Sequence, residues 1–102
     1  MKEIISKLNK IFESRIRLGI MSVLMVNDHA DFNSLKELLD ITDGNLASHL
    51  SALERNQLIK VTKQFVGRKP NTRYEATEEG RKAFREHLDH LDKLLKIQGE
   101  YE

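Results

Sequence analysis

A single β-hairpin signal limits the folds that are open to this chain. The run "IKVTKQFV" alternates apolar and polar side chains through Ile59, Val61 and Phe65, and "TRYEAT" repeats this strand-like character. The insert "GRKPN", residues 67–71, separates the two runs. Glycine and asparagine tolerate unusual backbone angles and proline fixes one, so we expect the whole insert to form the hairpin loop.

The other apolar residues recur at helical spacing. They predict helices near residues 2–12, 15–27, 34–40, 42–56 and 78–97. The expected N-terminal caps are Ser14, Asn33, Thr42 and Thr77. The order of four helices, a hairpin and a last helix predicts a mainly α protein with a small β-hairpin, an α+β fold.

Leucines mark the buried faces of the two middle helices. The expected apolar face of the helix at 34–40 consists of Leu35, Leu38 and Leu39, and Phe32 is expected in a short extended segment before it. In the helix at 42–56 the inward stripe consists of Leu46, Leu50 and Leu53. Two short helices joined by a tight turn are therefore expected directly before the hairpin.

Composition indicates one soluble globular domain. The 102 residues suffice for one modest core, and the content of 39% hydrophobic and 32% charged residues argues against a disordered chain. The sequence has no cysteine and does not begin like a signal peptide, and its longest apolar stretch is too short to span a bilayer, so we expect a cytoplasmic protein without a membrane partner. It contains no phosphate-binding loop, nucleophile elbow or HExxH motif, so neither an enzyme nor a cofactor is expected.

The face of the helix at 42–56 opposite its leucines carries small and polar side chains. This outward face holds Gly44, Ser48, Ser51 and Arg55, with Asn45 and Ala52 beside it. Such side chains suit a helix that enters a DNA major groove, which is about 12 Å wide. Helix, turn, helix and hairpin together form the winged helix-turn-helix arrangement, in which the hairpin is called the wing.

Positive charge is concentrated around the hairpin, although the formal net charge is only +1. The segment from Arg55 to Tyr74 contains six lysine or arginine residues and no aspartate or glutamate. They are Arg55, Lys60, Lys63, Arg68, Lys69 and Arg73. A patch of this kind is typical of proteins that bind a polyanion. We expect Arg68 and Lys69, at the hairpin tip, to reach a minor groove or the DNA backbone beside the helix.

The stretches "TDGNLASHLSALERNQLI" and "FVGRKPNTRYEATEEGR" resemble the winged-helix transcriptional regulators of the MarR/ArsR-like superfamily, in particular a compact single-domain prokaryotic group. The resemblance covers residues 14–90. It implies that Thr42–Arg55 is the DNA-reading helix, that Gly67–Asn71 is the wing tip, and that the wing joins the last helix at Thr72, Tyr74, Thr77 and Gly80. The function expected from the residues and the resemblance together is sequence-specific binding of double-stranded DNA by a homodimeric transcriptional regulator, a repressor.

The candidate DNA contacts lie on the helix and on the wing. They are Asp43, Gly44, Asn45, Ser48, His49, Ser51, Arg55, Arg68, Lys69, Asn71 and Arg73. Asn45 has the chemistry to bond adenine, whereas Arg55 suits a phosphate. His49 fits a DNA contact and a partly buried capping role equally well, and Arg73 fits either a phosphate contact or a brace of the hairpin.

Apolar residues of the terminal segments predict a dimer. Phe84, Leu88, Leu91 and Leu95 alternate spacings of four and three, as in a helix-pairing seam. The expected dimer-interface residues are Ile4, Leu8, Ile11, Leu88, Leu91 and Leu95. We therefore divide the single domain, residues 1–102, into a winged core at 14–77 and dimerisation segments at 1–13 and 78–102.

Two other interpretations stay open. The same scaffold could be a protein-interaction module whose wing meets an acidic partner. His87 and His90, three residues apart with Glu86 and Asp89 between and beside them, raise the question of a metal sensor. Two such ligands without a convincing third make a weak site, so no metal site is expected. The sequence names no small-molecule effector and no operator.

Overall fold

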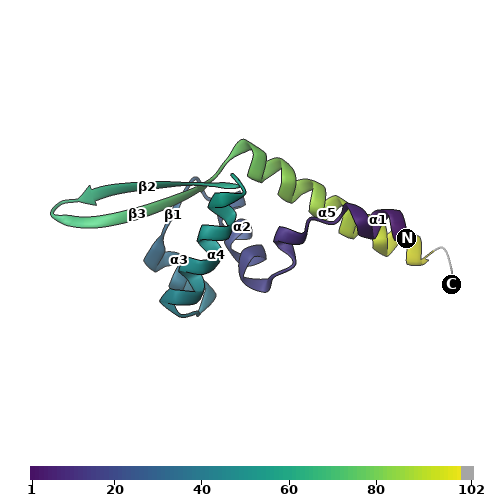
Figure 1. The fold of residues 1–102 in the computed structure, drawn as a ribbon, viewed down its shortest axis with the longest axis horizontal. Coiled ribbons are helices and arrows are strands. Elements are labelled where there is room, and N and C mark those ends of the chain that lie inside the picture. Colours follow the sequence, from purple (N-terminus) through teal and green to yellow (C-terminus); the bar gives the residue numbers. More distant parts are fainter. Residues whose placement is uncertain (100–102) are drawn as a thin grey trace.

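The computed structural model describes residues 1–99, in which helices surround the base of a long β-hairpin (Figure 1). The elements are α1 (Lys2–Lys7), the 3-10 helix η1 (Lys10–Phe12), α2 (Arg15–Val26), β1 (Ala30–Asp31), α3 (Phe32–Leu39), α4 (Asp43–Arg55), β2 (Ile59–Val66), β3 (Lys69–Ala76) and α5 (Glu78–Gly99). The expected mainly α fold with a hairpin is confirmed. The strand β1 was not expected, and it completes an antiparallel sheet of order β1-β3-β2.

The core lies where α2, α4 and the beginning of α5 meet the base of the hairpin. Leu46, Leu50 and Leu53 are buried, as their stripe predicts. The rings of Phe12 and Phe84 pack edge to face with centroids 5.2 Å apart, which joins η1 to α5. These contacts hold α4 by one face only, so its opposite face is free for other contacts.

The predicted helix at 2–12 is wrong in its second half. α1 ends at Lys7, Leu8 is extended, and η1 begins only at Lys10. Asn9 lies at the break, where its side-chain oxygen accepts a hydrogen bond from the backbone N–H of Ile11 at 3.1 Å. Asparagine competes in this way with helical hydrogen bonds, and here it caps a new turn instead of continuing the first helix.

The beginning of α3 also differs from the prediction. Asp31 caps this helix instead of Asn33: its carboxylate accepts the backbone N–H of Ser34 at 2.8 Å, and this bond lowers the pKa of Asp31. Phe32 is therefore the first helical residue and not part of an extended segment. Leu38, expected on the buried face, is exposed, whereas Leu35 is buried.

The hairpin turn is shorter than predicted. Only Gly67 and Arg68 connect β2 to β3, and Gly67 has the positive φ of 65° that a two-residue turn requires at one of its positions. Lys69, Pro70 and Asn71, expected in the loop, are the first residues of β3. Within residues 1–99, β1 pairs with β3 only at Arg73 and Tyr74, so β3 is an edge strand at Pro70, where a proline is tolerated.

The junction between the wing and α5 is held by two residues. The Thr77 hydroxyl accepts the Gly80 backbone N–H at 2.9 Å and donates to the Gln57 carbonyl at 2.7 Å, which confirms Thr77 as the cap. A Cβ on Gly80 would lie 2.0 Å from the carbonyl oxygen of Leu58. Only glycine lets α5 begin this close to Leu58, the last residue before β2.

The molecule is elongated, with extents of 60 × 26 × 21 Å. Figure 1 shows β2 and β3 projecting at one end, whereas α1 and the second half of α5 lie side by side at the other. Below, the wing means β2, β3 and the turn between them, and the terminal arm means α1 with the part of α5 that follows Phe84.

Candidate nucleic-acid interface

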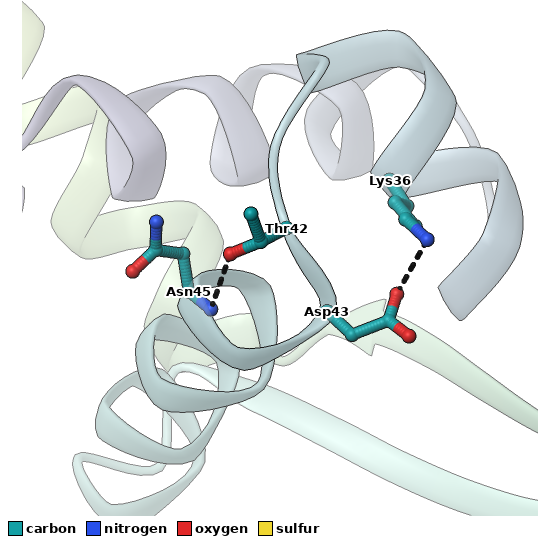
Figure 2. Close-up of polar contacts among 4 residues, drawn as sticks. All are labelled: Lys36, Thr42, Asp43 and Asn45. Atoms are coloured by element: carbon teal, nitrogen blue, oxygen red, sulfur yellow. Dashed lines mark hydrogen bonds and ion pairs between the residues drawn. The ribbon is translucent and has the colours of Figure 1, made fainter.

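The N-terminus of α4 is fixed by two polar contacts (Figure 2). The Thr42 hydroxyl accepts the backbone N–H of Asn45 at 3.2 Å, so Thr42 is the predicted cap. The Lys36 ammonium of α3 lies 2.7 Å from the Asp43 carboxylate. This ion pair was not foreseen, and it joins the two helices of the helix-turn-helix while occupying Asp43, a candidate DNA contact.

The exposed face of α4 carries the predicted side chains. Gly44, Asn45, Ser48, Ser51 and Arg55 are all exposed. Only the backbone N–H of Asn45 serves the cap, and its side chain points away from the Thr42 hydroxyl in Figure 2. In the described part of the chain, a Cβ built on Gly44 would meet nothing within 4 Å beyond its chain neighbours and the backbone of its own helix. The glycine is therefore not needed for packing, and it leaves room for close approach to this end of the helix.

His49 has a different role from its exposed neighbours. It is half-buried, and its Nδ1 lies 3.0 Å from the guanidinium of Arg17, which also donates to the Ile11 carbonyl. Burial and the Arg17 charge lower the pKa of His49, which favours the neutral imidazole. The residue thus joins α4 to α2 and leaves only its other ring nitrogen for a contact outside the protein.

A groove separates α4 from one face of the wing. Its walls are Ala47, Leu50, Ser51 and Glu54 on α4, and Val61, Lys63, Thr72 and Tyr74 on the wing. Burial raises the pKa of the Tyr74 phenol, and the Glu54 carboxylate adds to this effect. The Tyr74 phenol is therefore neutral, Lys63, Ser51 and Thr72 supply a cation and two hydroxyls, and Glu54 adds one carboxylate to the groove.

The remaining wing candidates lie on two other surfaces. Arg68 is exposed at the turn, and Lys69, the first residue of β3 and the partner of Val66, is exposed on the face opposite the α4 groove. Asn71 and Arg73 alternate with Thr72 and Tyr74 and therefore occupy the opposite face, away from the α4 groove. The Asn71 side chain accepts a hydrogen bond from Gln64 at 3.3 Å, and Arg73 is the register partner of Asp31. The expected basic patch is thus divided between the two faces.

Several residues of this surface were missed from the sequence as contacts or supports, Glu54 of the groove among them. Ala47 and Thr72 border the groove, Lys36 holds Asp43, and Arg17 holds His49. Ala47 is four residues before Ser51, and Thr72 is two before Tyr74, so helical and strand periodicity could have found both. The roles of Lys36 and Arg17 depend on how separate helices pack together, and no local sequence pattern indicates them.

Two further structural observations concern other kinds of site. Within residues 1–99, no three His, Cys, Asp or Glu side chains are close enough to share a metal ion. His87 is buried, and its Nδ1 accepts the backbone N–H of Asn9 at 3.2 Å, so this nitrogen already has a partner. No helix in the same part of the chain is long and apolar enough to cross a membrane.

A family model described as a winged helix DNA-binding domain matches residues 16–95. The chain belongs to this family. The winged helix family consists of DNA-binding domains and not of enzymes, and the match spans α2 to α5, including α4 and the wing.

Individual proteins agree with this winged helix assignment. The chain is 36% identical over 87 residues to an uncharacterized protein of Methanocaldococcus jannaschii, covering 85% of this chain and 95% of that one. A transcriptional regulator homologue from Pyrococcus horikoshii has a similar structure, with a TM-score of 0.83 and 35% identity over 95% of this chain and 94% of its own. A proposed MarR-family regulator of Enterococcus faecalis has the same fold at 22% identity, with a TM-score of 0.71 and coverage of 90% and 82%. The resemblance to winged-helix proteins is confirmed, and the likeness to the MarR-family regulator is one of fold.

Proposed function

We propose that this winged helix protein is a transcriptional regulator, a repressor, that binds specific double-stranded DNA sites as a homodimer. α4 enters the major groove, and the wing contacts the adjacent minor groove and backbone. The whole of residues 1–102 acts as one domain, with residues 14–77 as the DNA-binding core and the terminal segments as the dimer contact. Residues 100–102 of this assignment lie outside the described part of the chain.

The observation that carries the proposal is the contrast between the two faces of α4. Its leucines are buried, and its accessible side chains are small or polar, with open space beside Gly44. An ordinary surface helix more often carries long charged side chains on its accessible face. The adjoining wing adds Lys63, Arg68 and Lys69, which suit phosphates. The relative from Pyrococcus horikoshii, a transcriptional regulator homologue, supports the regulatory role.

The terminal arm supports the dimer. Leu88, Leu91 and Leu95 are 45%, 38% and 71% exposed, and Ile5 of α1, the helix that packs along α5, is 52% exposed. The chain exposes 7281 Å², whereas a folded monomer of its mass of 11.9 kDa exposes about 5,900 Å². Ile4 and Leu8 are half-buried, and Ile11 packs against the core of its own chain. The outward stripe for a symmetry mate is therefore Ile5, Leu88, Leu91 and Leu95.

Such a dimer explains how a small domain could recognise a site. A two-fold axis through the terminal arms places two copies of α4 on one face of the DNA, where half-sites lie about 34–36 Å apart. A repressor of this kind acts by occupying the site and excluding other proteins from it.

The salt dependence of DNA binding tests the proposal. If each protomer neutralises two to four phosphates, a dimer should give a log–log slope of roughly −4 to −7 against salt concentration, measured by fluorescence anisotropy with duplex DNA. A slope near zero on every duplex would contradict the proposal and favour a protein partner. Selection of bound fragments from a genomic library then tests sequence specificity, because an unspecific binder would enrich no common sequence.

A further inference from the structure

The wing carries an apolar patch that the proposed phosphate contacts do not use. Phe65 is 74% exposed, although it lies only two residues before the turn. Its cross-strand partner is Pro70, which is also exposed. Neither side chain contributes to the buried core of the described chain. An aromatic ring displayed next to Arg68 and Lys69 on a projecting ribbon therefore points to a contact with another molecule.

Strand alternation shows which way this patch faces. Phe65 is two residues from Lys63 and four from Val61, and Lys63 and Val61 line the groove beside α4. Side chains at this spacing share one face of a strand. Phe65 and Pro70 therefore extend the α4 side of the wing toward its tip. Val66 is similarly exposed, at 61%, but it occupies the opposite face.

The dimensions of DNA limit how the wing can bind. A minor groove is about 6 Å wide, and two strands are already about 4.8 Å apart before their side chains are counted. The ribbon as a whole cannot enter such a groove, whereas the side chain of Arg68 at the turn can. With α4 in the neighbouring major groove, the sugar–phosphate strand between the two grooves runs along the α4 side of the wing.

The sugar–phosphate strand alternates charged phosphates with the carbon atoms of deoxyribose. The α4 side of the wing carries side chains that suit each of them. Lys63 and Thr72 present a cation and a hydroxyl to phosphate oxygens. Phe65 and Pro70 present carbon surfaces, which suit the carbon atoms of deoxyribose. The charges of Arg68 and Lys69 direct the patch to a polyanion instead of a neutral apolar partner.

We propose that the Phe65 ring, with Pro70 beside it, packs against the deoxyribose edge of the DNA strand that separates the grooves occupied by α4 and Arg68. This contact rests on the proposed DNA-binding function. It adds an affinity for DNA that comes from apolar contact and not from the cationic side chains of the wing.

The variant Phe65→Ala tests this contact, with Val66→Ala as the matched control on the opposite face. The probe is a duplex of about 30 base pairs, long enough for two half-sites one helical turn apart, selected for binding to the wild-type chain. Phe65→Ala should weaken binding about tenfold, because part of an aromatic side chain is no longer buried. It should leave the salt slope unchanged, because no cation is lost. Val66→Ala should change affinity by less than about twofold, since it buries nothing on DNA.

Hydroxyl-radical footprinting adds a direct readout of the sugars. Wild-type protein should protect a short run of deoxyriboses beneath each wing, and Phe65→Ala should restore their cleavage while α4 contacts persist. Phe65→Leu should recover part of the protection because it keeps a large apolar side chain. Both altered positions are exposed, so circular dichroism should show an unchanged fold.

Several outcomes would overturn the sugar contact. Equal losses from Phe65→Ala and Val66→Ala, no loss from either, or a flatter salt slope in Phe65→Ala would each contradict it. A lower mass of free Phe65→Ala in sedimentation would assign the ring to a contact between two copies of the chain. If wild-type protein binds no duplex, both this contact and the proposed function fail; if it binds and Phe65→Ala binds equally well, only the sugar contact fails.

Discussion

The two ends of the molecule both project from the core, but they expose different chemistry. The wing and α4 display cations, hydroxyls and small side chains around one aromatic ring. The terminal arm displays a stripe of leucines. Both ends expose apolar side chains, Phe65 and Val66 on the wing and Leu91 and Leu95 on the arm, so exposure alone would not distinguish them. The side chains do, because polar and cationic groups suit DNA whereas a leucine stripe suits a second helix.

The two ends also differ in how firmly they are tied to the core. α4 is held by three buried leucines, the Thr42 cap and the Lys36–Asp43 ion pair. The terminal arm is held by fewer contacts, among them the bond between Asn9 and His87. A surface that must present side chains to a groove benefits from a rigid base. An arm that pairs with a copy of itself gains much of its order from the partner.

The largest expected effect comes from the leucine stripe. Leu91→Glu with Leu95→Glu should split the dimer, because four carboxylates would then face one another across the two-fold axis. DNA affinity should fall by about two to four orders of magnitude through lost bivalency, although each half-site contact stays intact. Sedimentation measures the mass, and fluorescence anisotropy measures DNA binding.

The control for this pair is Val26→Glu, an exposed apolar position at the end of α2 outside the stripe. It should leave the mass unchanged. A double variant that stays dimeric, or a wild-type chain that is monomeric at micromolar concentration, would show that the leucines serve another purpose.

The next-largest effect concerns α4, at the opposite end from the leucine stripe. It distinguishes a side chain that contacts bases from one that only stabilises the helix or contacts the DNA backbone. Asn45→Ala should cost about 1–3 kcal/mol at the cognate site and much less on random DNA, because a base contact is lost. Thr42→Ala removes the cap instead and should lower the stability of the fold by about 1 kcal/mol without altering sequence preference. Selection from a library and thermal unfolding measure the two results. Equal loss of affinity on both kinds of DNA would reassign Asn45 to the backbone.

The sequence predicted the features that depend on local spacing. The stripe of Leu46, Leu50 and Leu53 and the caps Ser14, Thr42 and Thr77 are confirmed, since each rests on residues within one or two helical turns. The cap of α3 was wrong because Asp31 and Asn33 are both good caps. The choice between them depends on β1, whose Ala30 pairs with Tyr74 far along the chain.

The wing shows why part of the site could not be derived. A five-residue loop leaves the register of the two strands open, and a shift by one residue exchanges the faces. The two-residue turn sets Thr62 opposite Arg73 and Lys63 opposite Thr72. This register places Asn71 and Arg73 on the face opposite Lys63 and pairs Phe65 with Pro70 on the α4 side.

A smaller effect is expected from the tip of the wing. Arg68→Ala with Lys69→Ala should weaken binding to all sequences and flatten the log–log salt slope by about one to two per protomer, as expected for lost phosphate contacts. Lys60→Ala is the control, since Lys60 lies near the start of β2, far along the strand from the turn, with its ammonium 3.8 Å from the Glu75 carboxylate. A slope that is the same in the double variant and in the wild type would remove the tip from the DNA surface.

The smallest effect concerns the hydrogen bond between Asn9 and His87, the joint between the terminal arm and the core. His87 is 5% exposed, and its Nδ1 accepts the Asn9 backbone N–H. Burial lowers the pKa of His87 below its ordinary value of 6.5; the Glu13 carboxylate opposes this shift, and His90 adds to it. The neutral ring is therefore the form that the fold favours. Its contribution to stability is fully present above about pH 6.5 and is lost as the pH falls through the lower folded-state pKa.

Stability should therefore decrease on acidification from pH 7 to pH 5, and His87→Asn should reduce that dependence. Asparagine places its Oδ1 near the position of Nδ1, so it can still accept the Asn9 N–H but takes up no proton in this range. His29→Asn, at an exposed position, is the matched control and should keep the wild-type pH dependence. Urea unfolding at several pH values gives the free energies. Because the proton would first break the bond to Asn9, the dimer should also dissociate more readily at low pH in the wild type than in His87→Asn. Identical pH profiles for His87→Asn and wild type would show that the joint does not titrate between pH 5 and pH 7.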